Sequence, residues 1–503
     1  MNKFVRLIIK MNDMKKFILI KNINRLTRIF SLLIIVTVTL IIFDFSNESI
    51  ILQCMSLNKS RLDRRFPFLA NITFSDIVFS PTPVDLNLDE TPEILIECLD
   101  GNLYVLQFGG ILFNFSIKRY IRGIPSAGDI DNDGFLEIIF PSGESIYALD
   151  YPSQRVIWKS SVNDCFKSSV IVRDIDLDGK LEIIAGGRHG VLYCIDGETG
   201  HLIWKVKSEK EFPHIFSPPI LADINNDDIY DVIYVLDSAE GQDIIAVSGE
   251  SGKILWIFQD AIPFTPLIAG DINGDKKSEI IFGGLRYLYV LNENGKLLWR
   301  FGEENKEFFF HGITLADINN DGKKEIIAVS VKGDVFAIDG KGHLIWKTYI
   351  EQSPFRNAFP IVADINGDEI LDIIIATFPG IVYVINGKSG SVFLTYHFDG
   401  YISETPCVAD INHDMLLELI VPVENKLYII GTQGRVYFWY SFMGDYSNCG
   451  NTELLLNISE RDSRGIYLHF LWLIIYLIIY CVICSFIGYI IIRIYQTLSS
   501  LSR

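Results

Sequence analysis

Residues 317–325 read DINNDGKKE, and variants of this acidic nine-residue string recur along the 503-residue chain. The string has the form D-[IL]-[DN]-x-D-x-x-x-[DE], and successive copies start 44 to 49 residues apart. A nearly constant spacing of this size indicates a repeat architecture in which each copy marks one structural unit. The eight copies, loops 1 to 8, begin at Asp85, Asp129, Asp174, Asp223, Asp271, Asp317, Asp364 and Asp410.

Each unit continues with the same order of short apolar runs. A run such as EIIAVS (325–330) follows the acidic string, and a second run with an aromatic residue, such as DVFAID (334–339), comes next. A turn containing Gly and a run that usually ends in Trp complete the unit, and another short run precedes the acidic string. Four short runs separated by Asn, Asp and Gly turns predict four β-strands per unit and no helix. The tryptophans are Trp158, Trp204, Trp256, Trp299 and Trp346.

Four strands in a repeat of this length is the size of a propeller blade. A single blade cannot bury both of its faces, so neighbouring blades must stack, and closing them into a ring removes the exposed ends. We therefore predict an all-β fold: a β-propeller of about eight four-stranded blades over residues 81–445, with seven blades as the alternative. A strand shared between the first and last blades is not evident unless residues 66–79 supply it.

The acidic strings have the composition of calcium loops. Calcium takes six to eight hard oxygen ligands, which suits carboxylates at positions 1, 3, 5 and 9 and a backbone carbonyl at position 7. An EF-hand is excluded because the acid at position 9 leads directly into a strand. The predicted Ca²⁺ ligands of loops 2 to 8 are Asp129, Asp131, Asp133, Glu137; Asp174, Asp176, Asp178, Glu182; Asp223, Asn225, Asp227, Asp231; Asp271, Asn273, Asp275, Glu279; Asp317, Asn319, Asp321, Glu325; Asp364, Asn366, Asp368, Asp372; and Asp410, Asn412, Asp414, Glu418.

The net charge also has its origin in these loops. Residues 46–466 carry a net charge of −26, and positions 1, 3, 5 and 9 of the eight loops hold 26 acids. Such crowded carboxylates raise one another's pKa unless a cation neutralises them. The alternative is that the loops are solvated turns whose Asp side chains accept hydrogen bonds from their own backbone.

The loops are not equivalent at position 6, where a sharp turn favours Gly. Gly134, Gly179 and Gly322 make loops 2, 3 and 6 the strongest candidates. Loop 1, with Pro92 before its closing acid, is the weakest, and loop 8, with Met415, is also weak.

Two apolar stretches bracket the acidic middle of the chain. Residues 29–43 follow a basic segment and fit a signal-anchor or a cleaved signal peptide, of which we favour the anchor. Residues 470–492 contain no charged residue and are long enough to span a bilayer. The basic N-terminus places residues 1–28 in the cytoplasm. The predicted order is a basic segment (1–28), the anchor (29–45), a linker (46–80), the propeller (81–445), a stalk (446–466), a transmembrane helix (467–492) and a cytoplasmic tail (493–503).

Glycosylation sequons and cysteines agree with an extracellular or luminal propeller. The pattern N-x-[ST] occurs at Asn47, Asn58, Asn71, Asn114 and Asn457. The acidic middle of the chain, residues 46–466, also holds six cysteines whose pairing the sequence leaves open: Cys54, Cys98, Cys165, Cys194, Cys407 and Cys449. A disulfide between Cys54 and Cys449 would join the two ends of the repeats, and free buried thiols are the alternative.

The two halves of each unit resemble two known repeats. The first half is similar to the FG-GAP repeats of integrin α-subunit heads, and the second, as in YCIDGETGHLIW (193–204), resembles the Trp-docked blades of pyrroloquinoline-quinone-type propellers. The combination with a C-terminal membrane helix resembles the plant defective-in-exine-formation proteins. The resemblance spans about residues 81–440 and implies that the loop acids above bind metal. The sequence departs from it at Asn114 and Leu394, where a docking Trp is expected.

These features favour a binding protein over an enzyme. A net charge of −18 argues against a nucleic-acid partner, because phosphate binding needs a basic face. Quinone-dependent enzymes resemble the second half-repeat but have an adjacent Cys-Cys pair, which this sequence lacks. We expect a non-enzymatic, integral membrane protein of the secretory pathway or plasma membrane whose propeller binds calcium and an unknown protein or glycan. A quinone-type propeller oxidoreductase is the alternative.

Overall fold

The computed structural model describes residues 66–116, 123–162, 164–302, 310–351, 359–402, 404–434 and 436–439. The chain divides into two units, Met1–Leu62 and Asp63–Arg503, and every described residue lies in the second. The described ranges contain the strands β1 to β33 and no helix. This confirms the all-β prediction.

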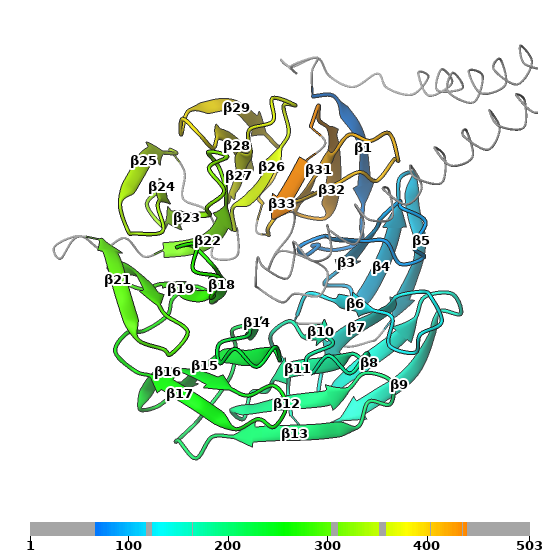
Figure 1. Cartoon of the computed structure of the whole chain (residues 1–503). Coiled ribbons are helices and arrows are strands. Elements are labelled where there is room, and N and C mark those ends of the chain that lie inside the picture. Colours follow the sequence, from blue (N-terminus) through cyan, green and yellow to red (C-terminus); the bar gives the residue numbers. More distant parts are fainter. Residues whose placement is uncertain are drawn as a thin grey trace, which may run out of the picture. The chain divides into compact units, whose positions relative to one another are not determined.

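The strands form eight antiparallel sheets arranged around a ring (Figure 1). Blades 1 to 4 consist of β2 (Thr82–Val84), β3 (Glu93–Glu97), β4 (Asn102–Gln107), β5 (Gly110–Ser116); β6 (Ser126–Gly128), β7 (Glu137–Ser142), β8 (Ser145–Asp150), β9 (Arg155–Ser161); β10 (Ile171–Arg173), β11 (Glu182–Gly186), β12 (Val191–Asp196), β13 (Leu202–Lys207); and β14 (Ile220–Ala222), β15 (Asp231–Ser238), β16 (Gly241–Val247), β17 (Ile254–Phe258). Blades 5 to 8 consist of β18 (Ile268–Gly270), β19 (Glu279–Gly283), β20 (Tyr287–Leu291), β21 (Leu297–Gly302); β22 (Phe310–Ala316), β23 (Glu325–Ser330), β24 (Asp334–Ile338), β25 (Leu344–Tyr349); β26 (Ile361–Asp364), β27 (Asp372–Thr377), β28 (Ile381–Asn386), β29 (Val392–His397), with β33 (Val436–Trp439); and β30 (Cys407–Ala409), β31 (Glu418–Val423), β32 (Lys426–Gly431), with β1 (Phe68–Thr73).

The second strand of each blade is apolar on both faces because the neighbouring blades cover both. All five residues of β11 are buried, whereas the outer strand β13 of the same blade alternates between exposed and half-buried residues. The core therefore lies between blades: Ile184 of blade 3, for example, packs in one cluster with Val232 of blade 4. Stacking of continuous apolar strands is what the repeat needs to bury its faces.

The first strand of the chain closes the ring. β1 pairs antiparallel with β32, so the N-terminal segment forms the outer strand of the last blade. Phe68 on β1 contacts the rings of Tyr396, Phe398 and Tyr428 at centroid distances of 6.5, 5.9 and 5.8 Å. The closing strand thus comes from residues 66–79, within the segment expected as a linker, and the ring has eight blades rather than seven.

One strand was not expected from the repeat pattern. After β32 the chain crosses to blade 7, where β33 pairs antiparallel with β26 and makes that sheet five-stranded. The backbone N–H of Gln433 donates to the carbonyl of Ile365 at 2.9 Å on the way. The segment that leaves the last blade is therefore bonded to the blade before it.

The tryptophans join each blade to the next. The indole Nε1 of Trp158 donates to the carbonyl of Gly197 in blade 3 at 2.8 Å. Gly200 has φ +70°, and a Cβ there would lie 2.7 Å from the Trp158 ring, so the turn requires Gly. The equivalent bonds run from Trp204 to Gly249, Trp256 to Glu293, Trp299 to Gly340 and Trp346 to Gly387, at 2.8, 2.9, 3.1 and 2.7 Å.

The register of the outer strands corrects one assignment. Each docking Trp sits beside a β-bulge, as Trp158 does opposite Ala148. In blade 1 the residue beside the bulge is Phe113, opposite Val105, and not Asn114. Phe113 contacts Tyr151 of blade 2 with ring centroids 6.0 Å apart, so an aromatic contact replaces the indole bond. In blade 7 the position is occupied by Leu394, as predicted.

Several predictions concern residues outside this part of the chain. The predicted membrane segments, residues 29–45 and 467–492, the stalk and the two cytoplasmic segments lie outside the described residues, as do Cys54, Cys449, Asn47, Asn58 and Asn457. No helix within the described residues is long and apolar enough to cross a bilayer. Cys98, Cys165, Cys194 and Cys407 are free thiols, and burial raises the pKa of the Cys98 thiol to about 11.

Candidate metal centres

The acidic loops lie on one face of the ring, because every loop joins the first strand of its blade to the second. Hydrogen bonds link neighbouring loops. The Leu136 N–H of loop 2 donates to the Leu86 carbonyl of loop 1 at 2.8 Å, and the Tyr230 N–H of loop 4 donates to the Ile175 carbonyl of loop 3 at 3.0 Å. The Asn320 amide of loop 6 donates to the Glu369 carbonyl of loop 7 at 3.2 Å.

The acid at position 9 is buried in every loop. Glu137, for example, is 0% exposed, and its Oε2 accepts the backbone N–H of Ile130 at position 2, at 2.9 Å. The same bond occurs in all eight loops, so this acid closes each loop onto its start. The other seven closing acids are Glu93, Glu182, Asp231, Glu279, Glu325, Asp372 and Glu418.

The acids at positions 1 and 5 shape the turn. In loop 2 the Gly134 N–H donates to Asp129 at 3.3 Å and the Phe135 N–H donates to Asp133 at 2.9 Å. Equivalent bonds hold the other loops, as in loop 8, where the Met415 N–H donates to Asp410 at 2.7 Å. Asp side chains accept backbone N–H groups readily and so stabilise such turns without any metal.

The backbone at position 6 has the conformation that favours Gly, whichever residue stands there. Position 6 has positive φ in every loop, including Glu90 (72°), Lys276 (67°) and Met415 (66°). Position 4 has positive φ as well, as in Leu88 and His413, which the pattern did not reveal. All eight loops adopt the same turn, and the five without Gly at position 6 place an L residue at positive φ there. The ranking of loops 2, 3 and 6 as the strongest calcium sites stays a prediction.

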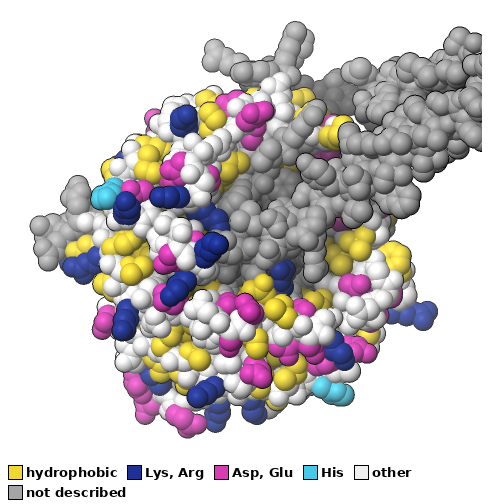
Figure 2. Space-filling model, in the orientation of Figure 1, with side chains coloured by type: hydrophobic (Ala, Val, Ile, Leu, Met, Phe, Trp, Pro, Cys, Tyr) yellow, Lys and Arg dark blue, Asp and Glu magenta, His cyan; other side chains and the backbone are white. Residues whose placement is uncertain are grey.

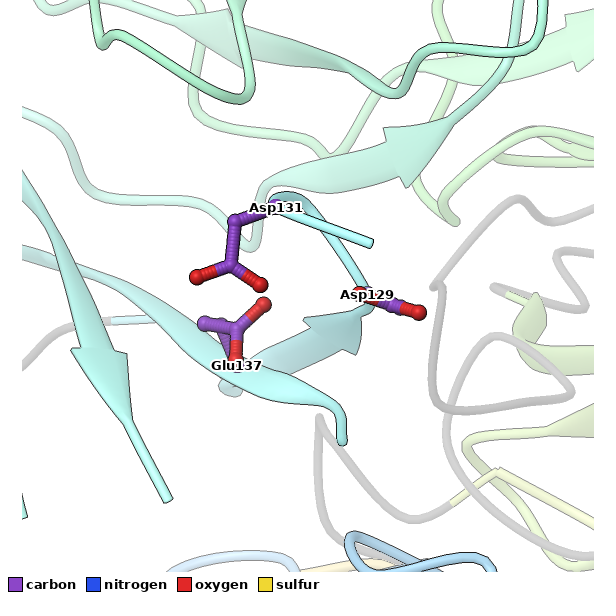
Figure 3. Close-up of side chains that lie close together, drawn as sticks. All are labelled: Asp129, Asp131 and Glu137. Carbon is purple, nitrogen blue, oxygen red and sulfur yellow. The ribbon is translucent and has the colours of Figure 1, made fainter. Parts of the chain in front are cut away.

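Three carboxylates converge in loops 2 and 3. In each, the acids at positions 1, 3 and 9 place one oxygen within 4.8 Å of the others; they are Asp129, Asp131 and Glu137 in loop 2 (Figure 3), and Asp174, Asp176 and Glu182 in loop 3. Asp133 and Asp178, also predicted as ligands, are not part of these groups. The Oε1 atom of Glu137 and the Oδ1 atom of Asp174 are buried and accept no hydrogen bond. Loops 2 and 3 therefore contain acceptor oxygens that a cation would satisfy.

Loops with Asn at position 3 are arranged differently. The Asn side-chain amide donates to the closing acid, from Asn273 to Glu279 at 2.9 Å, Asn319 to Glu325 at 3.1 Å and Asn412 to Glu418 at 2.9 Å. In loop 4 the corresponding distance, from Asn225 Nδ2 to Asp231 Oδ1, is 3.5 Å. Within the described residues, the predicted ligands of loops 4 to 8 do not converge as a group of three acids. Binding a cation in loops 5, 6 and 8 requires the amide to turn its oxygen inward. In loop 7 the Oδ1 atom of the closing acid Asp372 is buried and accepts no hydrogen bond.

Burial raises the pKa of the closing acids, because the charged form loses its hydration. The pKa rises to about 8 in Glu137, Asp372 and Glu418, and to about 7 in Glu182, Asp231, Glu279 and Glu325. The N–H bond from position 2 opposes the rise, and the other carboxylates of the loop add to it. A cation between these oxygens would oppose both burial and repulsion and favour the charged form.

By fold, this chain is an eight-bladed β-propeller, and a match to PQQ-like repeats is shown for residues 142–300. The family model described as "Outer membrane protein assembly factor BamB" matches residues 142–300. No curated protein sequence matches. Among solved structures, BamB from Moraxella catarrhalis is similar, with 15% identity, a TM-score of 0.51 and coverage of 73% of this chain and 98% of that chain. Two crystals of BBS1N in complex with ARL6DN, soaked with mercury and with lead, match with TM-scores of 0.45 at 11% and 12% identity, covering 73% of this chain and 97% of theirs. At 15% identity, the similarity to BamB concerns the fold alone.

Proposed function

We propose that the chain is a membrane-anchored, calcium-binding propeller that serves as a platform for another protein or a glycan on the non-cytoplasmic side of the membrane. The observation that supports calcium most directly is the carboxylate of Glu137. It is fully buried beside two further acids, and its Oε1 atom has no hydrogen-bond donor. A buried, unpaired carboxylate is costly unless a cation or proton satisfies it.

The ligand set favours calcium over other metals. The groups in loops 2 and 3 offer only carboxylate oxygens, whereas zinc and copper sites use His or Cys ligands. Magnesium requires a tight octahedral arrangement and keeps its waters, while calcium accepts irregular sets of six to eight oxygens. The role of the ion is structural, since it would hold together acids from the two ends of one loop.

The platform role rests on the fold and on the matching family model. A propeller presents broad faces built from many loops. In Figure 2, acidic, basic and hydrophobic side chains are intermixed over the visible face. The matched model is described as an outer membrane protein assembly factor, which supports a protein partner. A quinone-dependent activity finds less support, because the sequence has no adjacent cysteine pair.

Calcium titration of the purified propeller by calorimetry tests the metal assignment. We expect saturable binding in the range of extracellular modules, a Kd of about 0.1–1 mM. Glu137→Gln keeps the size of the side chain but removes its charge, so it should remove one binding site. The matched control is Glu93→Gln in loop 1, where no group of three acids converges, and it should leave the tightest sites unchanged. Absence of binding by the unaltered protein would refute the proposal.

The membrane placement has its own test. It rests on the basic segment 1–28 and the apolar segments 29–43 and 470–492. In sealed vesicles with the cytoplasmic side outward, protease should remove both termini and leave residues 46–466 intact with their glycans. Digestion of the propeller in sealed vesicles would show that the orientation is wrong.

A further inference from the structure

We propose that calcium binding at loops 2 and 3 is cooperative, and that the coupling passes through the turn of blade 3 on which Trp158 docks. This inference rests on the proposed calcium function. It adds a coupling between two metal loops through an inter-blade tryptophan contact, and so links metal occupancy to the joint between blades 2 and 3.

Gly197, the first residue of that turn, is bonded to loop 3 and to the tryptophan and lies beside loop 2. Its carbonyl accepts the indole N–H of Trp158 from blade 2 at 2.8 Å. Its own N–H donates to the carbonyl of Leu181 in loop 3 at 2.8 Å. A Cβ on Gly197 would lie 3.2 Å from the side chain of Ile130 in loop 2. Gly197 is thus bonded to loop 3 and to the docked indole, and it lies beside Ile130 of loop 2, which belongs to the same hydrophobic cluster as Trp158 and Leu181.

Each of these contacts is next to a predicted calcium ligand. Ile130 donates its N–H to Glu137, which closes loop 2. Leu181 immediately precedes Glu182, which closes loop 3. A cation that fixes either closing acid therefore fixes a residue that lies beside Gly197.

A second contact ties the turn to loop 3. The ammonium of Lys180, at position 7 of the loop, lies 3.2 Å from the carboxylate of Glu198 in the turn. Both side chains are exposed, so this ion pair adds little energy by itself. The pair shows that the turn of blade 3 and loop 3 are neighbours at Glu198 as well as at Gly197.

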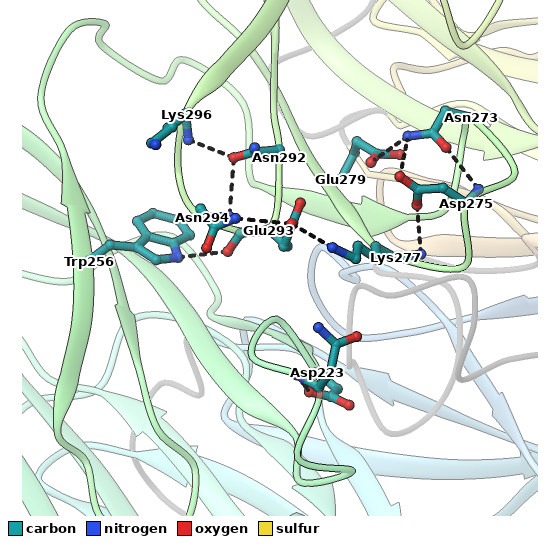
Figure 4. A network of polar contacts seen from close by, with 11 residues as sticks. Asp223, Trp256, Asn273, Asp275, Lys277, Glu279, Asn292, Glu293, Asn294 and Lys296 are labelled. Atoms are coloured by element: carbon teal, nitrogen blue, oxygen red, sulfur yellow. Dashed lines mark hydrogen bonds and ion pairs between the residues drawn. The ribbon is translucent and has the colours of Figure 1, made fainter.

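The connection between turn and loop recurs in blade 5 with different residues (Figure 4). There Trp256 donates to the carbonyl of Glu293, at 2.9 Å, and the Glu293 carboxylate pairs with Lys277 of loop 5 at 2.8 Å. The backbone N–H of Lys277 in turn donates to Asp275, a predicted ligand, at 2.9 Å. A docked indole and an acidic loop are therefore joined through the turn in more than one blade.

Shared contacts of this kind couple two binding sites. The first cation must order its loop, the turn and the indole together, whereas the second finds the turn already ordered. Coupling is reciprocal, so loss of either loop should weaken binding at the other by the same factor. Loops 2 and 3 are the pair in which to observe it, because both bring three acids together.

The experiment compares Glu137→Gln, Glu182→Gln and the double variant. Calcium titration should show that loss of loop 2 weakens binding at loop 3 about fivefold or more. In melting curves, the double variant should lose less of the calcium-induced Tm shift than the sum of the two single losses. The control pair is Glu137→Gln with Glu325→Gln in loop 6, which shares no turn with loop 2 and whose described residues bring no three acids together. Glu325→Gln should leave the calcium-induced Tm shift, and the loss that Glu137→Gln causes, unchanged.

The route is tested in a Trp158→Phe background, which keeps an aromatic ring but removes the indole donor. There the losses at loops 2 and 3 should become additive. A calcium shift with additive losses in the unaltered tryptophan background would refute the coupling and leave the proposed function standing. No calcium shift at all would refute both. If Trp158→Phe fails to melt cooperatively, the comparison between the adjacent and the distant pair still decides.

Discussion

Chelating calcium is expected to lower the melting temperature of the propeller by on the order of 8 °C. With a Kd of about 0.3 mM, 10 mM calcium stabilises the folded state by about 2 kcal/mol per site. Two sites, in loops 2 and 3, therefore contribute about 4 kcal/mol, and 1 kcal/mol corresponds to about 2 °C in a protein of this size. Without the ion, the buried acids Glu137 and Glu182 face two further carboxylates each.

Two controls separate this effect from general screening of charge. Magnesium at the same concentration should restore little of the stability, because it does not adapt to an irregular set of carboxylates. The Glu137→Gln, Glu182→Gln double variant should lose most of its response to calcium and should be more stable than the unaltered protein in chelator. Equal rescue by magnesium and calcium, or a melting curve indifferent to chelator, would leave these loops as Asp-rich turns.

The fold was predictable because one physical requirement repeats along the chain. Each unit has to bury the two faces of its second strand, as in β11, and only stacking with a neighbour does so. The closing strand β1 and the crossing strand β33 lie outside the repeat, and nothing in their own residues shows which sheet they join. The docking position of blade 1 was assigned to Asn114 instead of Phe113. The β-bulge that sets this position is a property of strand pairing and cannot be read from the spacing of residues.

The candidate site was predictable in its residues and less so in its geometry. The spacing of acids identified all eight loops, and the two loops in which three acids converge, loops 2 and 3, are among the three with Gly at position 6. Asp129 and Asp410 accept the same backbone N–H whether Gly134 or Met415 follows, so the turn forms in both. The difference that matters lies at position 3, where Asp131 joins an acid group and Asn412 donates to the closing acid instead.

Replacing Gly390 by Ala is expected to destabilise the propeller by about 3 kcal/mol or more, a fall in melting temperature of about 6 °C. Gly390 has φ +70°, and a Cβ there would lie 2.6 Å from the indole of Trp346. The indole cannot move away easily, because its Nε1 donates to Gly387 at 2.7 Å and the Thr348 hydroxyl donates to the Gly390 carbonyl. The cost therefore combines backbone strain of about 1 kcal/mol with overpacking of about 2 kcal/mol.

Gly322→Ala isolates the first of these two costs. Gly322 has a similar φ of +82°, but a Cβ there would have no atom within 4 Å. It should therefore lose only about 1 kcal/mol, the strain of an L residue at positive φ. Both variants are melted in chelator, so that an effect of Gly322 on calcium binding does not enter. A larger loss for Gly390→Ala would show that the indole of blade 6 is held against the turn of blade 7, whereas equal losses would mean that the tryptophan contact is loose enough to yield.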